Sequence, residues 1–319
     1  MPENPGMSRR KLIGLGAATI ASAALPDAIL GLSKAAAAAT GPSEGIGYFA
    51  RFGVTEKMLK DGLSAALSRG ADYADLFFQH RVSNGLGLED GEVNRASTSV
   101  ELGVGVRAIK GDQTGYAYTE ELTPEALLLA AKTAAAIADG PATPAPKGLK
   151  VGGALPARYP VKTRWEDVRP QQKLPLLSGL NEKVLAADRR IRKVNVSFGD
   201  EAGAILIADS NGRIVEDLQP MTRLYLSCVA EQDGKKETNG YNVAGRADIG
   251  FYSPEKLDRM VKEAVSRTLV LFDAVQPPAG EMPVVLGAGA SGILLHEAIG
   301  HGMEADFNRK GISIFSDRI

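Results

Sequence analysis

The chain has 319 residues, a formal net charge of −1 and 44% apolar residues. This length suffices for two domains, and the apolar content is ordinary for a globular protein. The near-neutral charge and the lack of a long basic run argue against nucleic acid as the main partner. The single cysteine, Cys228, excludes an internal disulfide, and its apolar neighbours predict a buried, inert thiol.

The N-terminus has the features of an export signal. Residues 8–13, SRRKLI, resemble the twin-arginine signal, and an apolar run over 12–25 and an alanine-rich stretch over 35–39 follow. A proline ends the apolar run, which is shorter than the roughly 20 residues of a membrane-spanning helix. We therefore predict a signal region over 1–40, export to the periplasm by the twin-arginine route, and no stable membrane span after signal removal. If the signal is not used, the expected location is cytoplasmic.

Residues 45–140 predict an N-terminal α+β domain. Apolar residues repeat at helical spacing over 55–68, and the tripeptide TPE at 123–125 has the residue types of a second helix start. Between these helices, turn residues such as SNG at 83–85 separate short apolar segments. These segments predict antiparallel strands over 73–82, 85–88, 99–109 and 115–118.

A proline- and glycine-rich linker over 141–160 leads to a central α+β domain over 161–276. Its first helix is predicted over 168–187, with a break near Pro175, and the tripeptide SPE at 253–255 begins a second one. Strands are predicted over 193–198, 203–208, 214–216 and 224–231, with a turn at 210–212. The predicted fold class is therefore α+β, with two units that each combine helices and an antiparallel sheet.

Residues 281–319 predict the start of a C-terminal domain. An apolar strand over 283–286, a turn of small residues and a helix over 293–301 come first, and a strand-like segment over 311–317 follows. About forty residues are too few to bury a core alone. We therefore expect this domain to be incomplete and the chain to be truncated at its C-terminus.

The helix over 293–301 carries two of the three histidines of the chain, His296 and His301, with Glu297 between them. Imidazoles are common zinc ligands, and a carboxylate beside a zinc-bound water can accept its proton. Residues five apart point about 140° apart on a regular α-helix, so convergence on one metal needs a local widening such as a π-bulge. Gly300 is a residue type that tolerates such a distortion. From the spacing alone, a metal site and a helix with merely hydrogen-bonded histidines both stay open.

The same region contains a possible nucleotide motif. Residues 287–292, GAGASG, match G-x-G-x-x-G between an apolar strand and a helix, which is the context of dinucleotide binding. The next acid at a strand end, Asp317, lies 25 residues beyond the last glycine (317 − 292), further than is usual, and the helix carries the histidines near its start. An exported dinucleotide-binding oxidoreductase and a non-catalytic partner or scaffold subunit are the alternatives to a metalloenzyme.

A longer segment favours the metalloenzyme. Residues 294–306, LLHEAIGHGMEAD, resemble the zinc-site segment of the TldD subgroup of the TldD/PmbA metalloproteases. The stretch from 103 to 118 resembles the N-terminal domain of this family, so the similarity spans roughly 45–319. The resemblance implies a TldD-type, catalytic subunit in which His296 and His301 bind zinc and Glu297 is the general base. The third ligand in this family is a cysteine of the C-terminal domain, expected here beyond Ile319.

Other polar residues receive weaker assignments. Glu304 and Asp306 follow the motif, and each is a candidate to hydrogen-bond a ligand or to substitute for one. Cys228 is not assigned the role of the family's cysteine, because it lies upstream in a strand pattern. His80, on a predicted strand, is expected to be structural.

The resemblance also implies an activity and partners. Zinc-activated water, with Glu297 as base, would hydrolyse peptide bonds in peptides or unfolded polypeptides. Family members pair, so we expect a homodimer or a heterodimer with a PmbA-type subunit. The truncated chain alone is expected to bind zinc weakly and to have little or no activity. The peptide substrate, the partner and the signal cleavage site are not predicted.

Overall fold

The computed structural model describes residues 46–151 and 159–318. The predicted signal region, 1–40, lies outside these residues. The chain divides into two compact units, Met1–Asp273 and Ala274–Ile319, which are described separately. Among the described residues, no helix is both long and apolar enough to cross a membrane.

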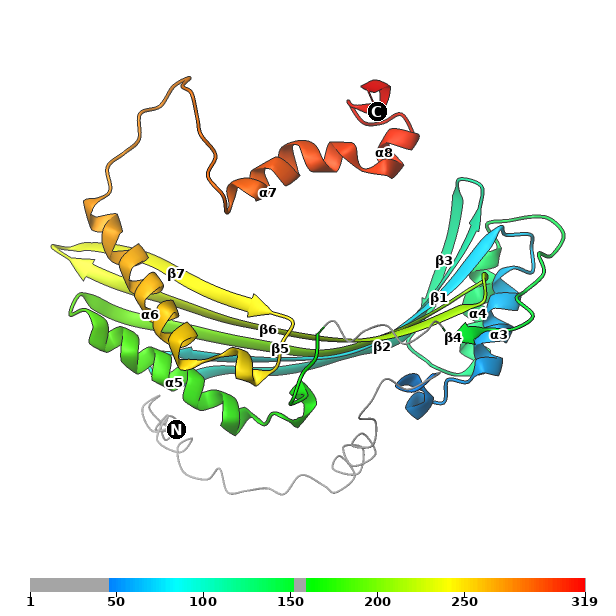
Figure 1. Cartoon of the computed structure of the whole chain (residues 1–319), viewed down its shortest axis with the longest axis horizontal. Coiled ribbons are helices and arrows are strands. Elements are labelled where there is room, and N and C mark those ends of the chain that lie inside the picture. Colours follow the sequence, from blue (N-terminus) through cyan, green and yellow to red (C-terminus); the bar gives the residue numbers. More distant parts are fainter. Residues whose placement is uncertain (1–45, 152–158, 319) are drawn as a thin grey trace, which may run out of the picture. The chain divides into compact units, whose positions relative to one another are not determined.

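One sheet is the framework of the first unit (Figure 1). Its seven strands in the described part of the chain are β1 (Tyr73–Glu89), β2 (Glu92–Lys110), β3 (Gln113–Thr119), β4 (Lys150–Val151), β5 (Ile191–Asp209), β6 (Arg213–Gln232) and β7 (Lys235–Gly245). Their order is β3-β2-β1-β5-β6-β4, and β7 also pairs with β6. The β4–β6 pair is parallel, whereas the other pairs are antiparallel. Helices beside a mainly antiparallel sheet confirm the predicted α+β class. The pairing of β1 with β5 joins the two predicted domains in one sheet.

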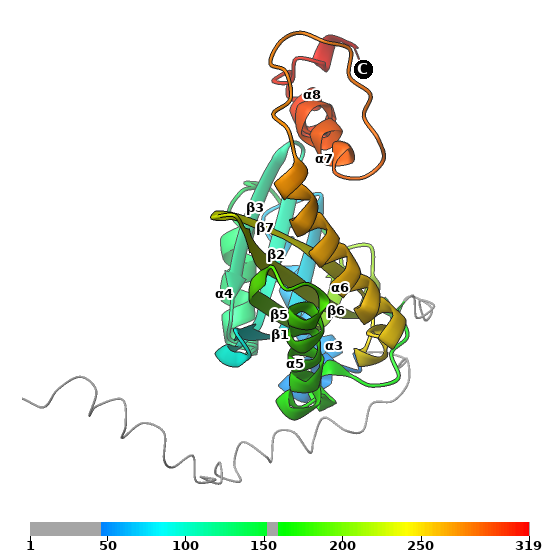
Figure 2. The ribbon, with the colours of Figure 1, turned by 90° about the vertical axis from the view of Figure 1, so that its left-hand side faces the viewer.

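Two pairs of helices pack on this sheet. They are α3 (Glu56–Ala66) with α4 (Pro124–Ala135), and α5 (Pro170–Ala187) with α6 (Pro254–Leu269). The first pair contacts β1, β2 and β3, whereas α5 contacts β5 and α6 contacts β6 and β7 (Figure 2). Short 3₁₀ turns connect these elements: η2 (Phe49–Phe52), η3 (Trp165–Asp167), η4 (Ile249–Phe251) and η5 (Val270–Asp273).

Hydroxyl caps begin three of these helices. The Thr123 side chain accepts a hydrogen bond from the backbone N–H of Ala126, and Ser253 accepts one from Lys256. Thr55 caps α3 in the same way. Each cap satisfies one of the backbone donors that a helix start leaves without a partner. The helix starts predicted from TPE and SPE are therefore confirmed.

The strands are longer than predicted. The segment 83–85, predicted as a turn, lies inside β1, and the strands predicted separately over 193–208 and 214–231 are continuous in β5 and β6. Asn84 pairs with Thr98 of β2 on one side and with Asp200 of β5 on the other. Because ladders on both sides bond the backbone of β1, its turn-forming residues remain extended.

Helix α5 contradicts the predicted break near Pro175, because it continues through that residue to Ala187. A proline in the second turn removes one backbone hydrogen bond, which disfavours but does not forbid a helix. Leu177, Leu180 and Val184 further along α5 are buried in the core, and their burial offsets that loss.

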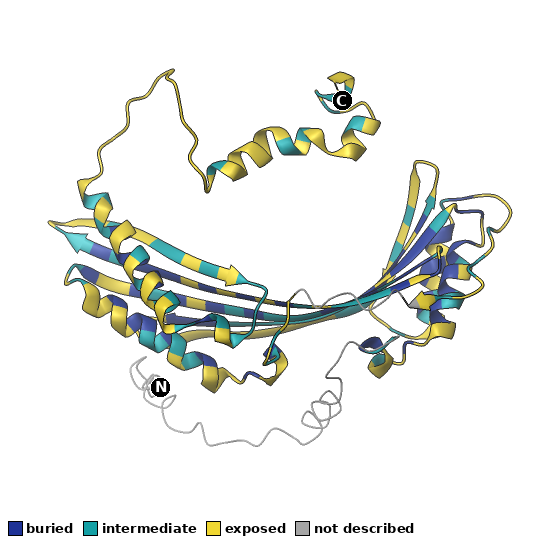
Figure 3. Ribbon diagram, in the orientation of Figure 1, coloured by how far each residue is buried: buried dark blue, intermediate teal, exposed yellow. Residues whose placement is uncertain are grey.

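Two hydrophobic cores lie on the same face of the sheet. One contains Leu76, Phe78 and Leu206 under α3 and α4, and the other contains Leu86 and Phe198 under α5 and α6. All these strand residues are even-numbered, and alternate strand residues share one face. We call this the helix face, and the side of the odd-numbered residues of β1, β2, β5 and β6 the open face. Figure 3 shows the alternation of buried and exposed positions along the strands.

A buried ion pair lies at the edge of the second core. The Nζ atom of Lys173 on α5 is 2.5 Å from Oδ2 of Asp200 on β5, and the two side chains are only 3% and 0% exposed. Asn84 donates a hydrogen bond to the other carboxylate oxygen of Asp200 at 2.9 Å. The rings of Trp165 and Phe198 flank the ammonium group. This network attaches α5 to two strands of the sheet.

The second unit contains short helical segments. They are α7 (Ser291–Leu295), η6 (His296–Gly300), η7 (His301–Met303), α8 (Ala305–Arg309) and η8 (Ser316–Arg318). The strands predicted over 283–286 and 311–317 are absent, because neither segment has a strand neighbour among the described residues. Most of this unit is exposed, including apolar residues such as Val285, Leu294 and Ile314 (Figure 3).

Candidate metal centre

The two histidines of the second unit lie on a helix that changes its winding. Helix α7 continues as the π-helical segment η6, and the backbone N–H of His301 donates to the carbonyl of His296, five residues earlier. The π-type widening that the histidine spacing requires for convergence on one metal ion is therefore present. Gly300 has ordinary helical dihedral angles, and a Cβ there would be 3.7 Å from Nδ1 of His296. The widening thus does not require a strained glycine, and Gly300 instead leaves room beside His296.

The π-helical segment brings His296, Glu297 and His301 together. One nitrogen or oxygen atom from each of these side chains lies within 4.8 Å of the others. The imidazole centroids are 4.6 Å apart, with the rings tilted by 70°. Oε2 of Glu297 is 3.5 Å from Nε2 of His301. All three side chains are exposed, so they can rotate toward a shared ion without disturbing a core.

Glu304 fixes the orientation of His301. Its Oε1 atom is 2.5 Å from Nδ1 of His301, and this hydrogen bond is the main cause of a raised pKa of His301. With Nδ1 bonded to a carboxylate, Nε2 is the ring nitrogen that remains on the side of Glu297. A carboxylate that holds the second nitrogen of an imidazole is a common partner of metal-binding histidines.

Asp306 lies further along the chain, in the first turn of α8, and is not among the three side chains that converge. The structure therefore distinguishes the two acids that the sequence left equivalent. Glu304 contacts a candidate ligand, whereas Asp306 is exposed and outside the cluster.

The other candidate ligands of the sequence belong to the first unit. Cys228 is buried in the second core, where its Sγ atom is 3.2 Å from Oγ1 of Thr268, and burial raises the pKa of its thiol. His80 contacts Tyr48 through a 2.7 Å hydrogen bond and packs edge-on against Phe52. Both residues therefore have local packing roles.

The context of a dinucleotide motif is not present around 287–292. Residues 283–286 form no strand in the structure. The hydroxyl of Ser291 donates to the carbonyl of Gly287, which closes the segment on itself. Without a preceding strand, these glycines lack the strand–turn–helix context that positions a pyrophosphate.

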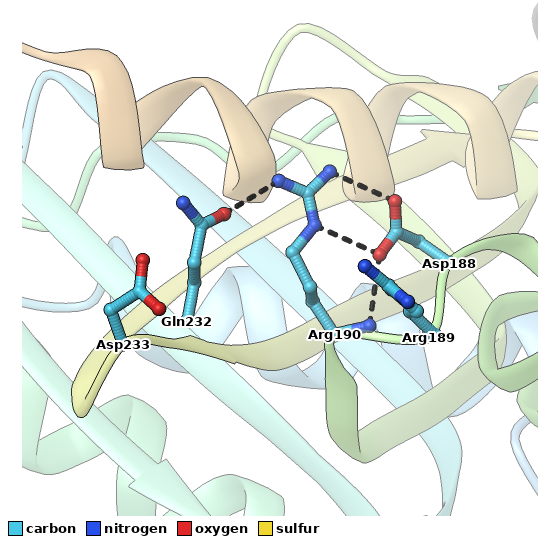
Figure 4. Close-up of a pocket in the computed structure, with 5 residues that line it drawn as sticks. All are labelled: Asp188, Arg189, Arg190, Gln232 and Asp233. Carbon is cyan, nitrogen blue, oxygen red and sulfur yellow. Dashed lines mark hydrogen bonds and ion pairs between the residues drawn. The ribbon is translucent and has the colours of Figure 1, made fainter.

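A polar pocket of the first unit lacks the combination of side chains that a catalytic site needs. It has a volume of about 510 Å³ and is lined by Asp188, Arg189, Arg190, Gln232 and Asp233 (Figure 4). Arg190 donates to both carboxylate oxygens of Asp188 and to the side chain of Gln232. This contact lowers the pKa of Asp188 to about 2. The arrangement joins the start of β5 to the β6–β7 hairpin.

Comparison with known proteins identifies the family. Residues 74–138 match the PmbA/TldA metallopeptidase domain 1, and residues 163–272 match the PmbA/TldA metallopeptidase central domain. The TldD homologue of Haemophilus influenzae, a metalloprotease, is 37% identical over 259 residues, which are 79% of this chain and 53% of that protein. A metalloprotease of Methanocaldococcus jannaschii is 27% identical over 256 residues, or 78% of this chain and 55% of that protein. The chain thus spans about half the length of these relatives.

Solved structures agree on the fold. A putative modulator of DNA gyrase from Bacteroides thetaiotaomicron has a TM-score of 0.54 and 17% identity, over 67% of this chain and 49% of that one. TldE from Thermococcus kodakarensis has a TM-score of 0.51 and 19% identity, over 67% of this chain and 47% of that one. The two matched domains and the similarity to TldD homologues show that the chain belongs to the PmbA/TldD family of metallopeptidases.

Proposed function

We propose that this protein is a zinc-dependent peptidase in which His296 and His301 bind the zinc ion and Glu297 is the general base. The observation that carries the proposal is the π-helical segment η6, which brings two histidines spaced five residues apart to the same side of the helix. A regular α-helix would point the two imidazoles to different sides, so it is the π-helical winding that would let them bind one metal ion.

The side chains present fit a zinc ion. Zinc takes imidazole nitrogens at about 2.0–2.1 Å, which puts two ligands of a tetrahedral site roughly 3.4 Å apart. The candidate atoms lie within 4.8 Å of one another, so small rotations of exposed side chains bring them to that separation. Imidazole nitrogens are typical ligands of catalytic zinc sites.

The proposed roles follow from these positions. Zinc bound here would polarise the scissile carbonyl group and lower the pKa of a bound water. Glu297, adjacent to His296 in the chain, would accept a proton as the water oxygen attacks the carbonyl carbon, and would donate it to the amine nitrogen as the C–N bond breaks. Glu304 holds His301 through Nδ1, which presents Nε2 to the metal. Asp306 stays a candidate to replace a ligand, with no contact in the structure that favours it.

The family supports further parts of the proposal. We infer that the substrates are peptides or unfolded polypeptides, and that the active form is a homodimer or a heterodimer with a PmbA-type subunit. A third protein ligand, a cysteine, is proposed to come from outside this sequence. The exposed apolar residues around the motif, such as Leu294 and Ile299, support the proposal that more polypeptide covers this unit in the active protein. The segment 8–13 supports export by the twin-arginine route.

Zinc affinity tests the proposal. We expect the full chain to bind one zinc ion weakly in competition with a chromophoric chelator, and His296→Gln to lose that binding. His80→Gln is the matched control, because it removes a histidine that bonds to Tyr48 instead, and it should leave zinc binding unchanged. Equal zinc binding by the His296 variant and the wild type would contradict the metal centre.

A further inference from the structure

We propose that the open face of the sheet binds an acidic segment of a polypeptide in a groove between Arg95 and Arg223. This inference concerns the first unit and does not depend on the metal centre. The groove has a volume of about 420 Å³ and is lined by residues of β1, β2, β5 and β6. We call it the arginine groove.

The strand register builds the groove from two adjacent rows of residues. One row runs Arg95–Gly87–Ser197–Tyr225 across the four strands, and the next runs Ser97–Gly85–Gly199–Arg223. All eight residues are odd-numbered and therefore lie on the open face. The two central strands contribute only glycine or serine, whereas the outer strands contribute Arg95, Arg223 and Tyr225, with Ser97 as the one small outer residue. Small residues thus form the floor, and an arginine stands on each side.

The width of the groove suits an extended chain. Strands β2 and β6, which carry Arg95 and Arg223, are separated by three strand spacings of about 4.8 Å, or roughly 14 Å. A single polypeptide strand fits within this distance, and its acidic side chains can reach a guanidinium group on either side. The hydroxyls of Ser97 and Ser197 offer hydrogen bonds to peptide groups, and the Tyr225 ring, 36% exposed, offers apolar contact.

The charge of the groove is positive and uncompensated. Within the described residues, neither Arg95 nor Arg223 has a carboxylate at ion-pair distance. The guanidinium carbon of Arg223 lies 5.8 Å from the centroid of the Tyr225 ring. The flanking acids on this face have other partners. Glu89 accepts a hydrogen bond from Asn94, and Glu201 is bonded to Arg81 and Ser83.

The two guanidinium groups of the groove favour a polypeptide that carries carboxylate side chains as the ligand. Arginine pairs with carboxylates through two parallel hydrogen bonds, which makes it selective for planar anions. The same groups also bind phosphate, so a phosphate-rich polymer is the competing ligand. The net charge of −1 for the whole chain disfavours nucleic acid, which proteins attract through extended basic surfaces.

Fluorescence anisotropy with labelled ten-residue peptides tests the inference on the full chain. An extended peptide with three Glu residues should bind at least about tenfold more tightly than the same peptide with Gln, and added salt should weaken the binding. Arg95→Gln and Arg223→Gln should each weaken it about fivefold, and the double variant about 25-fold. Arg259→Gln, which removes an exposed arginine from α6, is the matched control and should have no effect.

A second variant separates shape from charge. Gly199 has an unstrained backbone, and a Cβ there would meet only the carbonyl oxygen of Asn84 at 3.8 Å. Gly199→Leu should therefore fold, as checked by circular dichroism, but fill the floor and weaken peptide binding although both arginines remain. Equal binding of the Glu and Gln peptides, or unchanged binding by the double arginine variant, would overturn the proposal. Tighter binding of a single-stranded oligonucleotide than of the Glu peptide would also overturn it.

Discussion

The buried ion pair of the first unit and the histidine cluster of the second unit differ in their exposure to solvent. In the first unit, Lys173 and Asp200 are almost completely buried, bonded to each other and supported by Asn84. In the second unit, His296, Glu297 and His301 are exposed on a short irregular helix. Buried ion pairs are rigid and expensive to break, whereas exposed groups can rotate to accept a ligand. This difference fits our proposal, in which the sheet unit is the stable framework and the second unit holds the metal-binding groups.

The largest effect is expected from a substitution that breaks the buried ion pair between Lys173 and Asp200. Lys173→Met leaves the Asp200 carboxylate buried without its cation, so the free energy of unfolding should fall by about 3–5 kcal/mol. The double variant Lys173→Met/Asp200→Leu removes both charges and should recover much of that loss. Urea denaturation measures both values, and the zinc affinity of each variant should equal that of the wild type. A single variant as stable as the wild type would show that the pair does not hold α5 to the sheet.

A smaller effect is expected from Glu304, the acid that bonds His301. Glu304→Gln should lower zinc affinity by about 10–100-fold, the usual consequence of removing a group that orients a metal ligand. The stability of the first unit should not change. Asp306→Asn is the matched control, since Asp306 lies outside the cluster, and its zinc affinity should remain near that of the wild type. If both variants bind zinc as the wild type does, Glu304 does not position His301.

The smallest effect concerns the pH dependence of stability in the first unit. Burial lowers the pKa of His80, with Arg51 acting in the same direction and Glu166 opposing it. A depressed pKa means that the neutral ring is the form that the fold favours, so this contribution is present above a pH of about 6.5 and is lost as the pH falls through the pKa of the folded state. His80→Gln should therefore differ more from the wild type at pH 7.5 than at pH 5.5 in urea denaturation. A difference independent of pH would contradict this assignment.

Local features of the fold could be predicted from the sequence. Threonine or serine followed by proline and glutamate correctly marked the starts of α4 and α6, because a cap is decided by neighbouring residues. The spacing of His296 and His301 indicated the local condition for their convergence, a widened helical turn, and the structure has a π-helical segment there.

Long-range features could not be predicted. The SNG segment continues as a strand because β2 and β5 bond it from both sides, and β5 begins about a hundred residues later in the chain. The arginine groove was missed for the same reason. Arg95 and Arg223 are isolated in the sequence, and only the register of four strands places them on two sides of one floor. The predicted strand over 283–286 failed because its apolar pattern has no partner strand in the described residues.

Glu297→Gln gives the most direct test of the proposed peptidase. Glutamine keeps the size of the side chain but cannot accept a proton, so cleavage of an unfolded polypeptide by the zinc-loaded protein should fall by about 10²–10⁴-fold. Zinc content should stay the same, because His296 and His301 are unchanged, and it is measured on the same preparation. Full cleavage activity in the zinc-loaded Glu297→Gln variant would contradict the account.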